Sequence, residues 1–187
     1  MSSPYLFITV EELRVYPLPV KEAQWDKITD DQIEVVIGYA TENVQDYLDR
    51  SIFSGTYTER IPGSGKNLLI LSEYPVNTIY SIESHDSTDT VLEYDPDDLI
   101  LNEGAGLIKW ANAALTSFWR GFDWVISYTA GYSTIPGPIK HATALQTIAM
   151  LQPLFRGGTN FVQVDLVNDS NEMIVDLLER YKRKRIG

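Results

Sequence analysis

The chain has 187 residues, of which 44% are hydrophobic and 22% charged, values typical of one folded domain or a domain with one insertion. It contains no cysteine, which excludes disulfide frameworks and thiolate metal sites and suits folding in a reducing cytoplasm. No apolar run approaches the roughly 20 residues that cross a bilayer. Because residues 1–4 also lack the basic and apolar regions of a secretory signal, we expect no membrane partner.

The net charge of −11 is unevenly distributed along the chain. Residues 179–187 hold five cationic side chains and one carboxylate, a net charge of +4, which leaves −15 for the other 178 residues. This negative charge repels phosphate groups and therefore disfavours nucleic-acid binding. The basic end predicts docking to an acidic surface, although cations also favour helix C-termini without any partner. The five cations are Arg180, Lys182, Arg183, Lys184 and Arg185.

Two helices are predicted within the first fifty residues. Thr9 and Glu12 have the spacing of a capping box, which predicts a short helix, and residues 17–28 are predicted to form a loop. A second capping box starts at Thr29 and predicts a helix over about residues 30–49. Apolar residues recur along it with a period near 3.6 residues, as one buried face requires. They are Ile33, Val36, Ile37, Ala40, Val44, Tyr47 and Leu48.

Residues 55–130 are predicted to form a β-rich insertion. Glycine and proline separate short β-prone runs there, as in a small antiparallel sheet, with too little helical periodicity for a βαβ fold. Gly63–Gly65 and Glu103–Gly106 are predicted hairpin connections, because glycine adopts positive φ without steric cost. The predicted strands are Thr56–Ile61, Leu68–Leu71, Val76–Ser84, Leu99–Asn102, Leu107–Trp110 and Phe122–Tyr128.

Helices return after Pro136. The segment Ile139–Leu154 is apolar on two opposite sides, which indicates a helix central in its domain or buried against another subunit. Asp169 and Glu172 have the capping spacing of a last helix. The predicted fold is α+β, with a mainly helical core of three to four helices and a small antiparallel β-rich insertion. Its predicted parts are residues 1–54, 55–130 and 131–187.

Residues that could carry chemistry are few. His85 and His141 lie in different predicted elements, and no metal-binding or catalytic spacing surrounds them, so we predict no catalytic residue, metal or cofactor. A group of aspartates is interpreted as a solvated acidic turn, and it comprises Asp86, Asp89, Asp95, Asp97 and Asp98. A group of aromatic residues is interpreted as core and subunit contact, with a carbohydrate or nucleobase platform as the alternative. It comprises Trp110, Phe118, Trp119, Phe122 and Trp124.

The order of local signatures resembles one family. Residues 8–13 look like its short N-terminal helix, and the helix that ends at residues 44–52 resembles its first long helix. The run from Val125 to Tyr132, followed by Pro136 and an alanine-rich helix, is the most specific feature. Over about residues 8–156 the chain resembles the head-to-tail connector proteins of tailed bacteriophages, also called adaptor or head-completion proteins. The long loop at residues 14–28 and the large β block depart from the smallest members.

The resemblance implies a structural virion protein at the head–tail interface, made in the host cytoplasm. Such proteins form a ring, here expected to be a dodecamer, beneath the portal protein of the filled head. The ring extends the DNA channel, which DNA passes without specific binding, and docks a tail-side stopper or tail-completion protein. For the portal contact we choose the five C-terminal cations. For the contact between subunits we choose five residues of the apolar helix, namely Ile139, Ala142, Leu145, Ile148 and Leu151.

Two alternatives stay open at the level of sequence. Another head–tail joining component, such as a stopper or tail-completion protein, would tend toward a compact β-barrel, so a mainly helical core outside residues 55–128 separates it from a connector. A small carbohydrate-binding or carbohydrate-active module would use the β block, and a screen for glycan binding and hydrolysis with Trp110 and Trp119 substituted in parallel would distinguish it.

Overall fold

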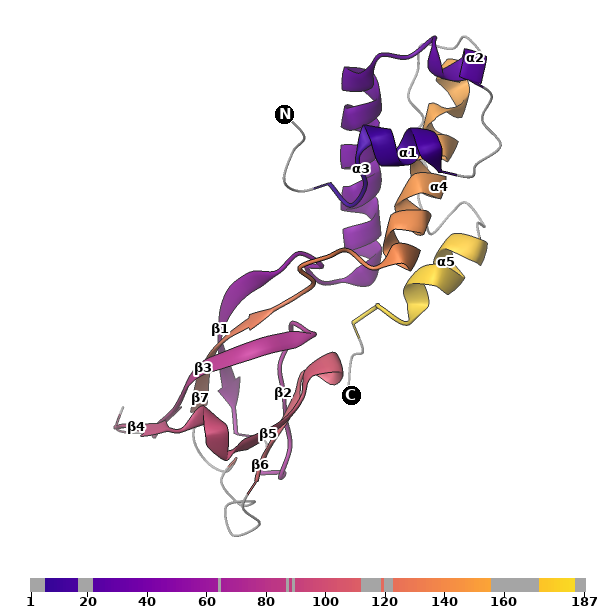
Figure 1. Cartoon of the computed structure of the whole chain (residues 1–187). Helices are drawn as coiled ribbons and strands as arrows, with labels where there is room; N and C mark the ends of the chain where they lie inside the picture. The colour runs from indigo at the N-terminus through magenta and orange to yellow at the C-terminus, as the bar shows by residue number, and fades with distance from the viewer. Residues whose placement is uncertain are drawn as a thin grey trace. The chain divides into compact units, whose positions relative to one another are not determined.

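The computed structural model describes residues 6–16, 22–63, 65–86, 88, 90–111, 119, 123–155 and 172–183. These residues form helices and antiparallel strands that fall into two units (Figure 1). The helical unit comprises residues 1–50 and 134–187, and the β unit comprises residues 51–133. The predicted α+β class is confirmed.

The elements follow one another in the order helices, strands, helices. The helices are α1 (Val10–Val15), α2 (Glu22–Trp25), α3 (Asp30–Leu48), α4 (Gly137–Phe155) and α5 (Glu172–Glu179). The strands are β1 (Gly55–Pro62), β2 (Leu69–Ile70), β3 (Val76–His85), β4 (Val91–Tyr94), β5 (Leu99–Asn102), β6 (Leu107–Trp110) and β7 (Asp123–Ala130). Two 3₁₀ helices, η1 (Pro96–Asp98) and η2 (Glu103–Ala105), flank β5. Within the described part of the chain, no helix has the length and apolar character that a bilayer span needs.

Both capping boxes predicted within the first fifty residues are present, whereas Asp169, the predicted cap of the last helix, lies outside the described residues. The Thr9 hydroxyl accepts the Glu12 N–H at 3.1 Å while the Glu12 carboxylate accepts the Thr9 N–H at 3.0 Å, and Thr29 and Gln32 exchange the same pair of bonds at 3.3 and 3.0 Å. These reciprocal bonds satisfy N–H groups that the first turn of a helix leaves without partners. They explain why α1 and α3 begin immediately after the two threonines.

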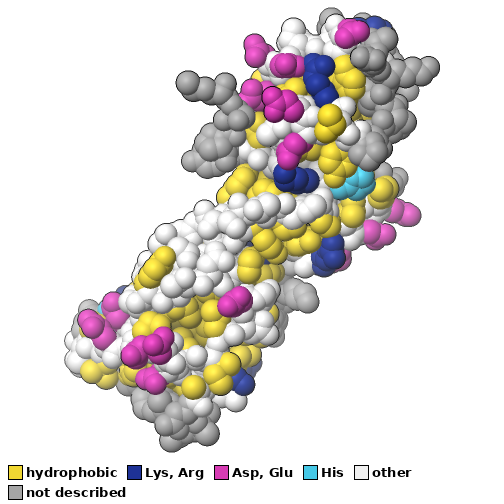
Figure 2. All heavy atoms as spheres, viewed as in Figure 1, with side chains coloured by type: hydrophobic (Ala, Val, Ile, Leu, Met, Phe, Trp, Pro, Cys, Tyr) yellow, Lys and Arg dark blue, Asp and Glu magenta, His cyan; other side chains and the backbone are white. Residues whose placement is uncertain are grey.

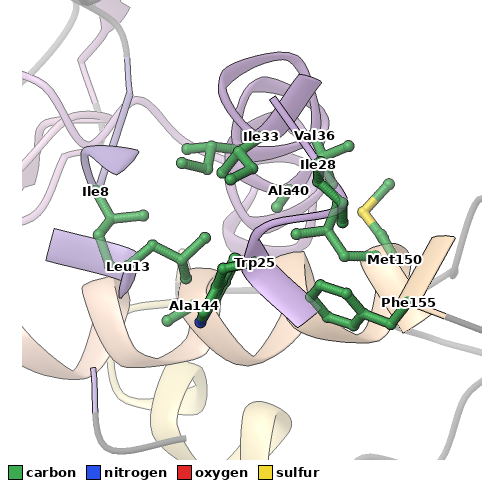
Figure 3. Packing of buried hydrophobic residues seen from close by; sticks show 12 residues of the cluster. Ile8, Leu13, Trp25, Ile28, Ile33, Val36, Ala40, Ala144, Met150 and Phe155 are labelled. Atoms are coloured by element: carbon green, nitrogen blue, oxygen red, sulfur yellow. The ribbon is translucent and has the colours of Figure 1, made fainter. Parts of the chain in front are cut away.

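The core of the helical unit lies between α3 and α4 (Figure 3). Ile33, Val36 and Ala40 of α3 approach the α4 side chains, and α1 closes the core with Leu13. The ring of Trp25, on α2, meets that of Phe155 edge to face, with centroids 5.5 Å apart. Each large side chain buried in this way stabilises the fold by roughly 1.5–3 kcal/mol.

The β unit contains two antiparallel sheets. The first has four strands in the order β1-β7-β3-β4, and the second has three in the order β2-β6-β5. All eight residues of β1 pair with β7, from Gly55 opposite Ala130 to Pro62 opposite Asp123. Side chains of β7 alternate between buried and half-buried positions, so one face of the first sheet faces the core of the unit.

The predicted turns and short elements agree with the structure only in part. The predicted hairpin at Gly63–Gly65 is wrong, because β1 pairs with β7 and β2 with β6. The hairpin at Glu103–Gly106 is confirmed, since β5 pairs with β6 and Gly106 has φ +62°. A short helix, α2, lies in the predicted loop over 17–28, and strand β4 was not predicted. Periodicity cannot detect elements this short, and a turn signal does not specify which strand the next one pairs with.

Candidate functional site

The two histidines lie in different units and take part in packing. The His141 ring, on α4, stacks on Tyr16 with centroids 5.4 Å apart. On β3, the His85 Nε2 atom lies 3.4 Å from a Glu83 carboxylate oxygen. Among the described residues, no three histidine or carboxylate side chains gather in a way that could hold a metal ion.

Carboxylates of the predicted acidic turn accept hydrogen bonds from backbone N–H groups two to four residues further along the chain. Asp86 accepts the N–H groups of Thr88 and Thr90 at 2.8 and 2.9 Å and the Thr88 hydroxyl at 2.7 Å. The hydroxyl bond to Thr88, followed by these backbone bonds, lowers the pKa of Asp86. Asp95 accepts the Asp97 N–H at 2.9 Å and so caps η1. These side chains shape turns, while Asp89 lies outside the described residues.

The aromatic group forms the core of the β unit. Trp110, Trp119 and Trp124 are 3%, 0% and 0% exposed, and their ring centroids lie 4.6–6.1 Å apart. Tyr94 packs on Trp124 with centroids 5.3 Å apart. The interpretation of these three tryptophans as core is confirmed, and Phe118 and Phe122 lie outside the described residues. Because a glycan platform needs exposed ring faces, Trp110 and Trp119 cannot form one.

The run Tyr128–Tyr132 joins β7 to the first residues of the β unit and to the segment before β3. The buried Tyr128 hydroxyl donates to the Glu59 carboxylate and accepts the Glu73 N–H at 3.2 Å. Burial first, and then the bond to Glu59, raise the pKa of Tyr128. The same Glu59 carboxylate accepts the Ser72 N–H at 3.1 Å, so this pair fixes the chain between β2 and β3.

Gly131 lies where two backbones approach each other closely. Its φ is +100°, and a Cβ atom added to it would lie 2.4 Å from the Phe53 carbonyl oxygen. Its N–H donates to the Pro75 carbonyl at 2.9 Å, and the next N–H, of Tyr132, donates to the Ile52 carbonyl at 2.9 Å. Only glycine fits this position. The most specific signature of the sequence therefore has a structural cause: it connects the two chain segments that enter and leave the β unit.

The five α4 residues predicted to contact another subunit have two kinds of environment. Ile139, Ala142 and Leu151 are fully buried within the single chain, whereas Leu145 and Ile148 are half-buried. Packing inside the helical unit accounts for the first three, because α4 contacts both α3 and α5. The subunit contact stays a prediction, and only Leu145 and Ile148 have surface left for it.

The described part of the basic segment is attached to the C-terminal end of α3. The Arg183 N–H donates to the Leu48 carbonyl at 3.0 Å, so it satisfies a carbonyl that the helix end leaves without a helical partner. The Tyr47 hydroxyl donates to a Glu179 carboxylate oxygen at 3.0 Å, and the Lys182 Nζ atom lies 4.3 Å from the Tyr47 ring centroid. Arg180 is exposed, and Lys184 and Arg185 lie outside the described residues.

Burial raises the pKa of Tyr47 to about 12, with the Glu179 hydrogen bond as the second cause. The hydroxyl therefore remains a hydrogen-bond donor at physiological pH. The cationic Lys182 lies near the C-terminus of α3, where the helix dipole also favours it.

These contacts fix the described part of the basic segment to its own chain. The contact between the basic segment and the portal stays a prediction.

Taken together, these features define an α+β protein whose distinctive residues serve packing, turns and backbone connections. The chain belongs to the head completion protein family, which matches residues 7–148. It is thus a structural virion protein of the head–tail connector class. No curated protein matches the sequence.

Solved structures share the fold across most of the chain. A chain of the "virion of native gene transfer agent (GTA) particle" has a TM-score of 0.63 at 16% identity, with 100% of this chain and 95% of that chain covered. A chain of the "neck of empty GTA particle computed with C6 symmetry" has a TM-score of 0.56 at 14% identity, covering 95% and 88%. One from the "neck of native GTA particle computed with C12 symmetry" has a TM-score of 0.54 at 12% identity, covering 82% and 84%.

Proposed function

We propose that twelve copies of this chain form a closed ring beneath the portal protein of a packaged head, without catalytic activity of their own. The ring extends the DNA channel and docks the tail-side stopper or tail-completion protein after packaging. The family match over residues 7–148 carries this proposal. The twelvefold symmetry named for the neck of the GTA particle supports the number of subunits.

The charge of the chain is compatible with a channel wall. Outside residues 179–187 the net charge is −15, and in the view of Figure 2 acidic side chains lie over α3 and on the β unit. A surface of this sign repels the DNA phosphates, so a passing duplex would meet few sites to which it could adhere. DNA would thus move through the ring without being bound by it.

A connector fits the described core better than the other joining components. Outside residues 55–128, the described elements are the five helices and the end of β7, with 19 residues in each of α3 and α4. A stopper or tail-completion protein built as a compact β-barrel would lack this helical unit.

Portal docking is expected to depend on the basic segment. Alanine at Lys182, Arg183, Lys184 and Arg185 should weaken binding to the portal about tenfold or more at physiological salt, because charge pairs at an interface rim steer and hold the partner. The Arg183 backbone bond to Leu48 survives this change, so α5 should stay in place. Surface plasmon resonance at two salt concentrations measures the effect.

A matched variant removes four cations elsewhere. Its four exposed positions are Lys27, Arg60, Lys66 and Lys109. Alanine at these positions should leave the affinity for the portal within about twofold of the wild-type value. If the variant with alanine at residues 182–185 bound the portal as tightly as the wild-type protein, the basic segment would not bind the portal. If both variants lost the same affinity, the loss would be an effect of net charge and not of the basic segment.

A further inference from the structure

An exposed stripe on α3 has no partner among the residues that the structure describes. Val35, Tyr39, Glu42 and Asp46 follow one another at spacings of four, three and four residues, which places them on one face of the helix. Val35 is 54% and Tyr39 53% exposed, and Glu42 and Asp46 are exposed beside them. We call these four residues the α3 stripe. Helix α3 carries five carboxylates and no cationic side chain, so a partner of this face should be apolar at one end and basic at the other.

A groove on α5 has that chemistry. It is lined by Glu172, Met173, Asp176, Leu177 and Arg180, and we call it the α5 groove. Met173 is 53% exposed, Leu177 is half-buried and Arg180 is exposed. Ile174 and Leu178 are buried and attach the helix to the unit, so the groove lies on a flank of α5 that the described residues leave uncovered.

The two surfaces lie on different sides of the helical unit. Helix α4 packs against both α3 and α5, and Figure 1 shows α3 on one side of α4 and α5 on the other. The α3 stripe is opposite the buried α3 face that contains Ala40 and Val44. A closed ring needs two different, complementary faces on each subunit, because the same contact repeats around the axis. The α3 stripe and the α5 groove meet this requirement.

We propose that the α3 stripe of one copy of the chain docks in the α5 groove of the next copy, with the two helices parallel. This inference rests on the proposed ring and specifies its subunit interface. Both surfaces have the same four-and-three spacing, over a length of about 10 Å. The alignment pairs Met173 with Val35, Leu177 with Tyr39, and Arg180 with Glu42.

The alignment also accounts for the acidic residues of the groove. Asp176 comes opposite Gly38, where the nearest side chain is the uncharged Leu6, whose Cδ2 atom would lie 4.0 Å from a Cβ atom added to the glycine. Glu172 comes opposite Glu34, which is half-buried on the flank of α3 and thus turned away from the stripe. Arg180 lies over its own Tyr181 ring at 4.9 Å, an arrangement that leaves its guanidinium at the surface of the subunit. Apolar groups thus meet apolar groups, and the cation meets a carboxylate.

Reciprocal charge variants test the contact. Glu42→Arg and Arg180→Glu should each lower the amount of ring at least tenfold when the full chain is incubated with its portal protein, as measured by native mass spectrometry and negative-stain microscopy. An equimolar mixture of the two variants should restore the ring, because the two kinds of subunit can alternate around an even-numbered ring and every contact then joins opposite charges. Thermal melts should stay within about two degrees of the wild-type protein, which separates assembly from folding.

The controls and the mixture decide between the outcomes. Asp97→Arg and Lys109→Glu, both exposed in the β unit, should leave the ring unchanged. Normal ring formation by both single variants would overturn the inference while leaving the ring intact. A double variant carries Glu42→Arg and Arg180→Glu in the same chain. If it formed the ring but the mixture of single variants did not, the contact would lie within one chain and the inference would also be overturned. If the wild-type protein forms no ring with its portal, the proposed function itself is wrong.

Discussion

Replacing Gly131 with alanine is expected to destabilise the protein by about 3 kcal/mol or more. The new Cβ atom would lie 2.4 Å from the Phe53 carbonyl oxygen and 2.9 Å from the Ser54 Cα atom, and both are backbone atoms that cannot move independently. The φ of +100° adds strain for any residue with a side chain. Relieving this clash would separate the Tyr132 N–H from the Ile52 carbonyl and so break the backbone hydrogen bond that joins the start of the β unit to its end. Guanidinium denaturation followed by tryptophan fluorescence measures the loss.

Gly104 supplies the matched control. It lies in η2, and a Cβ atom added to it would meet no atom within 4 Å. Gly104→Ala should therefore change the free energy of unfolding by less than about 0.5 kcal/mol. If Gly131→Ala proved as mild as this control, the close approach between Gly131 and Phe53 would not exist in the protein.

Removing the Trp124 side chain is expected to lower the free energy of unfolding by about 3–5 kcal/mol, because the loss of so large a side chain would leave a cavity in a closely packed core. Trp124 is fully buried between Tyr94 and the other two tryptophans of the β unit, with centroids 5.3 Å from Tyr94 and 4.6 Å from Trp119. The variant Trp124→Ala should unfold at a lower denaturant concentration, and far-UV circular dichroism can follow the transition without the tryptophan signal.

An exposed aromatic residue of the same unit provides the comparison. Tyr80, on β3, is 59% exposed, so Tyr80→Ala should cost less than about 1 kcal/mol. If Trp124→Ala were equally mild, Trp124 would not be a core residue. A glycan platform would then again be possible for the β unit, and glycan binding by the wild-type protein would have to be measured.

The long helices could be predicted from the sequence because their signals are local. Thr29 and Gln32 fix the start of α3, and apolar residues from Ile33 to Leu48 repeat at helical spacing. The buried face of α3 contains six of the seven residues predicted for it, and only Tyr47 is half-buried instead. Capping and periodicity act within a few residues, so one sequence is enough to detect them.

The strand partners could not be predicted in the same way. Glycine at residues 63 and 65 marks a turn, yet β1 pairs with β7, about sixty residues further along the chain. A pairing of this kind depends on which hydrophobic faces and cross-strand side chains meet in the folded unit. Strand β7 offers β1 eight paired positions, whereas β2 is only two residues long. Such a comparison requires three-dimensional structure.

The surfaces proposed for the subunit contact could not be predicted from the sequence for a related reason. An apolar helix can face its own core or a neighbour, and the pattern of α4 does not distinguish them. The structure places Ile139, Ala142 and Leu151 inside the chain. The α3 stripe gives no signal in the sequence, because Val35 and Tyr39 are only two apolar residues among carboxylates. Their exposure and the position of α5 reveal them as candidates.

Imaging the protein together with the portal of the same particle by electron cryomicroscopy tests the central claim most directly. We expect a closed ring of twelve copies of this chain on the tail-facing side of the portal, around an open channel. A complex in which the chain binds as single copies, or does not bind the portal at all, would contradict the account.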